Sequence, residues 1–454
     1  MDLKNIHRVY FIGVGGIGMS AIARYFCENG KQVAGYDKTP SEITDTLILI
    51  GVQIHFEDNV ALIPEDFKKK EGTLIVYTPA VPANHKELKF FQINGFVTLK
   101  RAQILGEITK NTYCLGVAGT HGKTTTSSIL GHIMNVCGTE ATAFLGGITE
   151  NYDSNLILGQ DKVSVVEADE FDRSFLQLSP NIACVTSMDA DHLDIYGEKE
   201  ALETSFKEFS SKVSDTLIVS KGLPLEGLTY AIDEEADYMI TNVVVEKGAY
   251  VFDVKTPKAK LEGVGFGLPG RHNLSNALAA IALAEQYGLS LPEIAKALTT
   301  FLGVKRRFSY KIKEENFVLI DDYAHHPTEI NAVVDAVREL YPAKEVLAVF
   351  QPHLYSRTRD FIDEFATSLS RFDELLLLDI YPARELPIEG VDSNWLLNKI
   401  KLDKKQLIAK EDVLKAIRKS NATVVVMIGA GDIGVLIEKV KSTLLINNSN
   451  TEII

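Results

Sequence analysis

The chain has 454 residues, of which 46% are hydrophobic and 24% charged, and its formal net charge is −14. A single core stops growing near roughly 250–300 residues, so this length predicts two or three globular domains. The net negative charge argues against a general nucleic-acid binder. The absence of an apolar leader or span favours a cytoplasmic protein with no membrane segment. The absence of paired cysteines favours a reduced compartment.

The first block predicts a nucleotide-binding α/β fold. A strand at 9–12 leads into Gly13-Val14-Gly15-Gly16-Ile17-Gly18 and an apolar-periodic helix at 19–26, and a second strand at 32–36 ends at Asp37. This is the dinucleotide fingerprint, in which glycines admit a diphosphate to a helix N-terminus. It favours an NAD-dependent dehydrogenase if taken alone, but a UDP group meets the same need. The candidate residues are Gly13, Gly15, Gly16, Gly18 and Asp37.

The second block opens with a strand at 112–115 and carries the strongest local signal, Gly119-Thr120-His121-Gly122-Lys123-Thr124-Thr125. Backbone N–H groups of such a turn bind phosphate oxygens, a lysine reaches the outer phosphates, and a hydroxyl ligates Mg²⁺. The spacing departs from the usual phosphate loop, because Val117 stands where the first glycine is expected. An ordinary turn with a surface lysine is the alternative, but the flanking strand and helix favour phosphate binding.

Acidic residues follow two later strands of this block. Glu167-Ala168-Asp169-Glu170 follows a strand at 163–166, and Asp189-Ala190-Asp191-His192 follows one at 182–185. Because parallel strands end at one edge of a sheet, we expect these groups to converge on Lys123 as a magnesium–nucleotide site. A single acidic loop residue is often only solvated. Short β-rich pieces from 217 to 266 predict a small antiparallel addition, followed by helices at 273–287 and 291–299.

The third block has strands at 317–320, 346–350, 375–378 and 424–428 with helices between them. Two polar loops follow its strands, Asp321-Asp322-Tyr323-Ala324-His325-His326-Pro327 and the loop at 351–359. No third ligand at a familiar spacing accompanies the paired histidines, which argues against zinc. Arg306-Arg307 could bind phosphates or be an ordinary surface pair. The glycines of 429–434 could bind a diphosphate or only permit close helix packing.

At these residues the chain resembles the Mur ligase family over nearly its whole length. The loop at 119–125 is similar to that family's ATP loop, and Pro269-Gly270-Arg271-His272-Asn273-Leu274-Ser275-Asn276 matches its adenine-side motif. The resemblance implies ATP and Mg²⁺ as cofactors and three α/β domains: a Rossmann-like domain at 1–106, a P-loop-type central domain at 107–308 and a Rossmann-like domain at 309–454. The pattern of strands and helices itself predicts linkers near 106–108 and 306–312.

The resemblance also assigns roles to individual residues. The implied ATP-binding residues are Gly119, Thr120, His121, Gly122, Lys123, Thr124, Thr125, His272, Asn276, Arg307 and Asp322. The implied magnesium ligands are Thr124, Glu167 and His192. The implied catalytic residues are Lys123, Glu167, His192 and His325, with His192 or His325 as the general base.

The glycine turn and the Gln-Pro-His-x-Tyr-x-Arg-Thr-Arg loop at 351–359 look like those of the family member that adds alanine. The implied amino-acid-binding residues are Tyr323, His325, His353 and Arg357, while Leu354 stands where many members have arginine. The implied partners are UDP-N-acetylmuramate, L-alanine and ATP, with no nucleic acid or membrane, for a monomer or weak homodimer. A member that joins a tripeptide to the same UDP-sugar, a nicotinamide dehydrogenase and a regulatory nucleotide-binding module are the alternatives.

Overall fold

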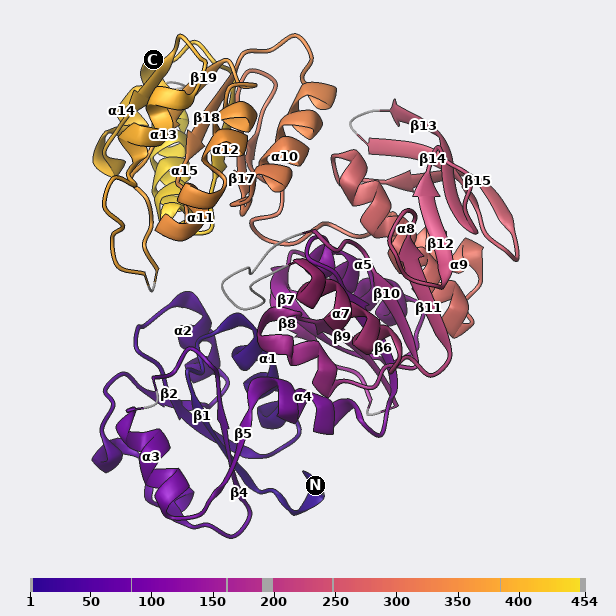
Figure 1. Cartoon of the computed structure of the whole chain (residues 1–454), viewed down its shortest axis with the longest axis vertical. Coiled ribbons are helices and arrows are strands. Elements are labelled where there is room, and N and C mark those ends of the chain that lie inside the picture. The colour runs from indigo at the N-terminus through magenta and orange to yellow at the C-terminus, as the bar shows by residue number, and fades with distance from the viewer. Residues whose placement is uncertain are drawn as a thin grey trace. The chain divides into compact units, whose positions relative to one another are not determined.

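The computed structural model describes residues 3–82, 84–160, 162–189, 199–246, 249–383 and 385–449. Contacts divide the chain into two compact units, and Figure 1 labels the helices and strands within them. Unit 1 comprises Met1–Glu246, Tyr250–Gly267 and Leu274–Leu302. Unit 2 comprises Lys247–Ala249, Leu268–Asn273 and Gly303–Ile454. Three β-sheets with helices between their strands lie within these units, as the sequence predicts.

The first sheet of unit 1 is a five-stranded parallel sheet with the order β3-β2-β1-β4-β5. Its strands are β1 Arg8–Ile12, β2 Gln32–Tyr36, β3 Gln53–His55, β4 Thr73–Tyr77 and β5 Val97–Lys100. Its helices are α1 Ile17–Glu28, α2 Glu42–Leu49, α3 Lys86–Ile93 and α4 Arg101–Thr109. Residues 106–108, where a linker was predicted, therefore lie inside α4.

The second sheet of unit 1 has ten strands in the order β15-β14-β13-β12-β11-β10-β6-β9-β7-β8. They are β6 Tyr113–Ala118, β7 Thr142–Thr149, β8 Ser154–Ile157, β9 Val163–Ala168, β10 Ile182–Val185, β11 Thr216–Ser220, β12 Leu228–Ile232, β13 Tyr238–Glu246, β14 Ala249–Lys255 and β15 Lys260–Phe266. Its helices are α5 Lys123–Val136, α7 Lys199–Ser210, α8 Arg271–Tyr287 and α9 Leu291–Leu298. The predicted helices at 273–287 and 291–299 are thus confirmed.

The β-rich pieces after 217 differ from the predicted antiparallel addition. Strands β10 to β13 continue the central sheet in parallel, and β14 pairs antiparallel with β15. The β12–β13 pairing covers only three residues on each strand, from Tyr230↔Tyr238 to Ile232↔Ile240. Three residues span about 10 Å, so the short connection between β12 and β13 can return without a helix. Alternation of apolar residues does not reveal strand direction, and that part of the prediction is wrong.

The two sheets of unit 1 are joined through α1. One face of α1 packs on β1 and β2, and the helix also contacts β7 and β8 of the second sheet. Asn155 donates from Nδ2 to the carbonyl of Ile17 at 2.6 Å and to Ser20 Oγ at 2.9 Å, and the rings of Tyr25 and Phe144 lie 5.3 Å apart. Buried polar and aromatic contacts of this kind fix a helix in place. The glycine turn before α1 is therefore held at a defined distance from the second sheet.

Unit 2 contains a six-stranded sheet with the order β16-β17-β21-β18-β19-β20, in which only β16 runs antiparallel to its neighbour. Its strands are β16 Ser309–Lys313, β17 Val318–Asp322, β18 Val346–Phe350, β19 Glu374–Leu377, β20 Lys405–Leu407 and β21 Val424–Ile428. Its helices are α10 Pro327–Leu340, α11 Tyr355–Asp360, α12 Ile362–Leu369, α13 Ser393–Lys399, α14 Val413–Lys419 and α15 Ile433–Ser449. No helix in the described part of the chain has the length and apolar character of a membrane span.

Candidate active site

The loop between β6 and α5 has the backbone of an anion-binding turn. Gly122 caps α5 with a φ of 82°, a conformation that side-chain-bearing residues rarely adopt. A Cβ there would lie 2.5 Å from Asn276 Oδ1, so the loop packs directly against α8. The first N–H groups of α5 are left unbonded by the helix and carry partial positive charge. The predicted phosphate-type turn therefore has the required local shape.

Lys123 is the first residue of α5, and its amine is held by oxygen atoms on both sides. Nζ lies 2.6 Å from the carbonyl oxygen of Gly119 and 2.7 Å from Glu170 Oε2. Desolvation acts to lower the pKa of Lys123, but the carboxylates of Glu170, Asp169 and Glu167 outweigh it and raise the pKa above its ordinary value. The amine therefore carries a permanent positive charge at the mouth of the loop.

Thr124 and Glu167 bring two hard oxygen donors next to this lysine. The Thr124 hydroxyl donates to Glu167 Oε1 at 3.1 Å, and the backbone N–H of Gly146 donates to Glu167 Oε2 at 2.9 Å. Mg²⁺ prefers oxygen ligands and usually takes one or two from protein beside phosphate oxygens and water. The donor set fits a magnesium–phosphate group, although no cluster of three or more His, Cys, Asp or Glu side chains able to hold a metal occurs among the described residues.

The far side of the loop is tied to the residues that follow β10. Thr120 Oγ1 and Ser187 Oγ lie 2.9 Å apart, and the N–H of His121 donates to Ser187 Oγ at 2.8 Å. The N–H of Asp189 donates to Thr120 Oγ1 at 3.0 Å. Thr126 Oγ1 donates to Asn276 Oδ1 at 3.3 Å, which links α5 to α8. The loop is thus braced before any ligand arrives.

The structure brings Lys123, Thr124 and Glu167 together, as the sequence predicts, and places Asn276 beside the same loop. Thr125 is buried one position further along α5. His192, predicted as a metal ligand and candidate base, lies outside the described residues. The sequence predicted that the run containing Glu170 would converge on Lys123 but gave Glu170 no role of its own; its fully buried side chain pairs with the lysine amine. The available signal was its place in the same acidic run after β9.

The turn at 13–18 connects β1 to α1, and Asp37 lies beside it at the end of β2. The N–H of Gly15 donates to Asp37 Oδ2 at 2.7 Å. Asp37 therefore stabilises the turn itself, a role that the fingerprint does not specify. A Cβ on Gly18 would lie 2.7 Å from Arg101 Nη1, so this glycine admits the guanidinium of the first residue of α4.

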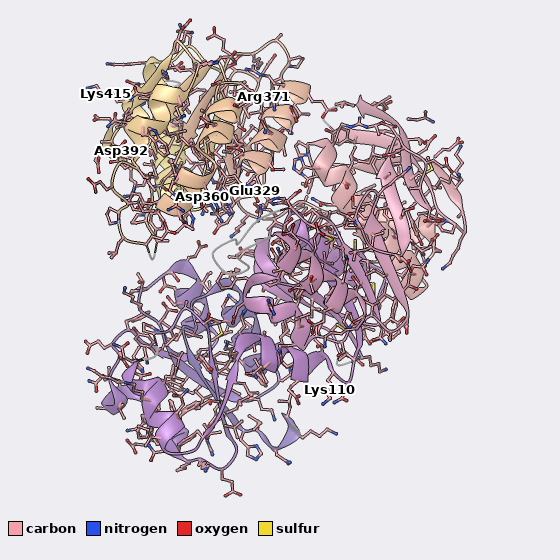
Figure 2. All side chains as sticks on the ribbon, viewed as in Figure 1. Lys110, Glu329, Asp360, Arg371, Asp392 and Lys415 are labelled. Carbon is pink, nitrogen blue, oxygen red and sulfur yellow. The ribbon has the colours of Figure 1, made fainter. Side chains whose placement is uncertain are left out.

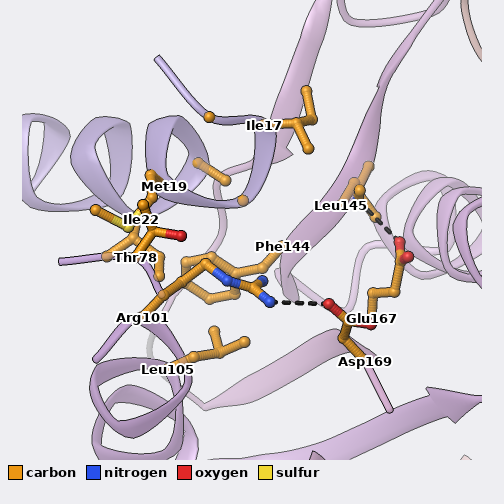
Figure 3. A pocket seen from close by; sticks show the side chains of 14 residues that line it. Ile17, Met19, Ile22, Thr78, Arg101, Leu105, Phe144, Leu145, Glu167 and Asp169 are labelled. Atoms are coloured by element: carbon orange, nitrogen blue, oxygen red, sulfur yellow. Dashed lines mark hydrogen bonds and ion pairs between the residues drawn. The ribbon is translucent and has the colours of Figure 1, made fainter. Parts of the chain in front are cut away.

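A cavity of about 280 Å³ lies between this turn and the end of β9 (Figure 3). Its walls include Gly16 and Gly18 from the turn and Glu167 and Asp169 from the acidic run. Arg101 Nη2 donates to Asp169 Oδ2 at 3.0 Å across it. Glu167 therefore contributes both to the cavity and to the contact with Thr124, so the glycine turn and the phosphate-type loop border one continuous site.

In unit 2, Asp322 lies buried at the end of β17. Its two carboxylate oxygens accept from the N–H groups of Phe308 at 2.8 Å and Ala324 at 2.7 Å. Burial raises the pKa of Asp322 to about 6, although the charge of Arg307 and these two hydrogen bonds act to lower it. Asp322 is therefore an acceptor that titrates close to neutral pH.

The residues around Asp322 form a compact polar cluster. Arg307 Nη1 lies 3.8 Å from Glu329 Oε1, and its guanidinium lies 5.4 Å from the centre of the Tyr323 ring. Glu329, labelled in Figure 2 at the start of α10, also accepts from the backbone N–H of His325 at 2.9 Å. Desolvation, followed by the charge of Arg357, lowers the pKa of His325 despite the opposing charge of Glu329. The imidazole is therefore neutral at pH 7.

His353, at the start of the second polar loop, completes the cluster. Its ring lies 5.9 Å from that of His325 and stacks on Tyr381 at 5.7 Å, and its Nδ1 lies 3.5 Å from Arg357 Nη1. The four predicted amino-acid-binding residues thus belong to one continuous set of contacts. The sequence reasoning missed Tyr381, which no local pattern distinguishes from other aromatic residues.

The second glycine pattern receives side chains of its own domain. A Cβ on Gly434 would lie 2.6 Å from the guanidinium carbon of Arg306, and one on Gly431 would lie 2.5 Å from Gln351 Oε1. Arg306 also donates to the carbonyl of Gly429 at 2.6 Å. These contacts support the packing interpretation of the pattern. They also hold Arg306 against the glycines at 429–434. Both guanidinium groups still lie over the Tyr323 ring, that of Arg306 at 5.0 Å and that of Arg307 at 5.4 Å from its centre.

His272 belongs to the short segment of unit 2 that precedes the body of α8. Desolvation and the charge of Arg307 lower its pKa to about 4, so the ring is neutral at physiological pH. A neutral imidazole can offer one donor and one acceptor to a base or ribose. The charge of Arg307 acts on the pKa values of both His272 and Asp322, so these three predicted ATP residues lie near one another in unit 2.

Comparison with protein families matches three segments of the chain. The Mur ligase family catalytic domain matches residues 8–113, the Mur ligase middle domain matches 117–284, and the Mur ligase glutamate ligase domain matches 306–433.

Individual relatives match over nearly the full length. A UDP-N-acetylmuramate–L-alanine ligase from Flavobacterium psychrophilum is 60% identical, with 98% of this chain and 99% of the relative covered. One from Christiangramia forsetii is 58% identical with the same coverage. The crystal structure of UDP-N-acetylmuramate–alanine ligase MurC from Thermotoga maritima is similar with a TM-score of 0.82 and 26% identity over 98% of this chain and 99% of that one.

Proposed function

The chain belongs to the Mur ligase family, and we propose that it joins L-alanine to UDP-N-acetylmuramate in peptidoglycan precursor synthesis with conversion of ATP to ADP and phosphate. The observation that carries this proposal is that Glu167 belongs both to the phosphate-type loop site and to the cavity beside the glycine turn. It contacts Thr124 beside Lys123 and also lines the cavity that reaches the glycine turn of the first sheet. A phosphoryl donor and a UDP-linked acid held at those two places would meet at one carboxylate.

The reaction needs energy because a carboxylate is a poor acylating agent. We propose that the sugar carboxylate attacks the γ-phosphate of ATP to give an acyl phosphate, which the alanine amine then captures with release of phosphate. Lys123 neutralises charge on the outer phosphates as they transfer. Thr124 and Glu167 would hold Mg²⁺, which supplies further charge neutralisation when bound. Asp322 would accept from the ribose, and His272 and Asn276 would contact the adenine side.

The alanine side of the reaction requires an unprotonated amine. His325 is neutral at pH 7 because desolvation lowers its pKa, so its imidazole can accept the proton that alanine must lose. Arg357 and His353 lie next to it and offer donors to the alanine carboxylate. We therefore propose His325 as the base and Tyr323, His353 and Arg357 as the amino-acid pocket. A cytoplasmic location and a monomer or weak homodimer remain part of the proposal.

The test is the formation of ADP, phosphate and a new amide from UDP-N-acetylmuramate, ATP and magnesium with a panel of amines. The panel contains L-alanine, glycine, L-serine and the murein tripeptide, with products identified by mass spectrometry. We expect turnover to be fastest with L-alanine and absent without the UDP-sugar. Turnover with the tripeptide alone would move the chain to the tripeptide-adding activity, and reduction of NAD⁺ or NADP⁺ without ATP use would remove it from the ligases.

A further inference from the structure

Arg101 occupies an unusual place in the cavity of unit 1. Among the described residues that line the cavity, it supplies the one positive charge, while Glu167 and Asp169 supply two negative charges. Its side chain is 23% exposed, and Figure 3 shows its guanidinium extending from the start of α4 toward the acidic run. A strongly anionic substrate would be repelled by this wall if the arginine were absent.

The geometry of the guanidinium leaves part of it directed at the glycine turn. Nη2 contacts Asp169 at 3.0 Å, whereas Nη1 lies nearest to the Cβ position of Gly18 in the first turn of α1. A guanidinium carries five N–H donors in a rigid fork, so one edge can pair with Asp169 while another donates to a second oxyanion. The missing side chain at Gly18 is what permits this approach.

We propose that Arg101 is a positioning residue that binds an oxyanion of the UDP-sugar in this cavity, with Asp169 balancing its charge when no sugar is bound. The inference rests on the proposed function, and it adds a residue that the glycine fingerprint does not contain. The UDP-sugar offers two oxyanions, its diphosphate and its carboxylate. Either one would lie between the turn that binds the nucleotide and the run that meets Thr124.

The ion pair also links this substrate to the phosphate-type loop. Asp169 belongs to the same run as Glu167, which contacts Thr124, and Glu170, which pairs with Lys123. An oxyanion that shares the guanidinium with Asp169 therefore acts on the segment that orients both loop residues.

The decisive experiment measures binding without ATP by calorimetry, on wild-type protein and on Arg101→Ala, Arg101→Lys and Asp169→Asn. The probes are UDP-N-acetylmuramate, UDP-N-acetylglucosamine, which lacks the carboxylate, and UDP. We expect Arg101→Ala to weaken UDP-N-acetylmuramate binding at least about tenfold, since charge-assisted hydrogen bonds are among the strong ones. Arg101→Lys should recover only part of that loss. Weaker binding of all three probes identifies the diphosphate, and weaker binding of UDP-N-acetylmuramate alone identifies the carboxylate.

Asp169→Asn is the matched control because it breaks the same ion pair but keeps the arginine. We expect its affinity for the UDP-sugar to equal or exceed that of the wild type. Equal losses in Arg101→Ala and Asp169→Asn, with parallel drops in thermal stability, would show a purely structural tether and overturn the proposal. Normal sugar binding by Arg101→Ala in an enzyme whose wild type forms the amide would overturn this inference alone. Wild-type protein that binds sugar but forms no product counts instead against the proposed function.

Discussion

The loop at 119–125 in unit 1 favours the charged form of its ionisable group, whereas the polar cluster around Asp322 in unit 2 favours the neutral forms. Lys123 is surrounded by carboxylates that raise its pKa, so its charge persists at any physiological pH. Asp322 and His325 are shifted by desolvation toward their neutral forms. The difference matches two chemical needs, because phosphate transfer requires a permanent positive charge and amine activation requires a neutral base.

The largest effect should follow from removing the permanent charge. We expect Lys123→Ala to lower kcat for amide formation by at least about a thousandfold, because the loss of charge stabilisation falls on the transferring phosphate. ADP release measured with both substrates present checks this. Near-normal turnover would remove Lys123 from the mechanism.

A control is needed because the substitution leaves the buried Glu170 without this lysine, and an uncompensated buried charge destabilises a protein. The double variant Lys123→Ala/Glu170→Gln removes both charges and should be as inactive as the single variant but closer to the wild type in thermal stability. Lys89→Ala, at an exposed position on α3, should leave turnover unchanged.

The next effect probes the amino-acid side of the comparison. Arg357→Ala should raise the KM for L-alanine by about tenfold to a hundredfold while changing the KM for ATP by less than about threefold, since a guanidinium–carboxylate contact is lost. Initial rates with each substrate varied separately provide the measurement. Arg371→Ala, on the same domain but paired with Asp335 at the surface, is the control. Equal changes in both KM values would contradict the pocket assignment.

Much of this arrangement is predictable because its signals are local. The glycine turns, the alternation of strand and helix and the polar loops at strand ends all depend on neighbouring residues. The partner of Lys123 was not predictable, because Glu167, Asp169 and Glu170 are equivalent in composition and only the path of the chain beyond β9 decides which oxygen meets the amine. Arg101 was missed for a different reason. It reaches the site from a strand end far from every motif, and nothing in its local sequence marks it.

A smaller effect should appear as a pH dependence in unit 2. Asp322 has a pKa of about 6, so it is a carboxylate above that pH and a neutral acid below it. If it accepts a hydrogen bond from the ATP ribose, kcat/KM for ATP should fall severalfold as the pH drops from about 7.5 to about 5.5. Asp322→Asn cannot ionise and should show a lower but flatter profile over this range. An unchanged acid limb in that variant would assign the titration to another group.

The smallest effect tests whether burial alone raises the pKa of a carboxyl group that has no proposed ligand role, as burial does for Asp322. Glu87 in the first sheet's domain is fully buried, accepts from Tyr10 Oη at 2.7 Å and from the N–H of Asn59 at 3.1 Å, and has a pKa raised to about 7, chiefly by burial. A raised carboxyl pKa contributes stability that is present below the unfolded value and lost as the pH rises through the folded value.

Glu87→Gln removes this titration, so its Tm relative to the wild type should increase by a few degrees between about pH 5 and pH 8, an effect on the order of 1–3 kcal/mol. His85 has a lowered pKa, and its loss of stability as the pH falls occurs in both proteins and cancels in the difference. His55 Nε2 lies 3.3 Å from Glu87 Oε1, so its titration is coupled to that of Glu87 and is part of the measured difference. Thermal unfolding of the two proteins at matched pH measures it. A constant difference in Tm would mean that Glu87 is ionised throughout the range, and that the contrast between Lys123 and Asp322 reflects their particular partners more than their burial.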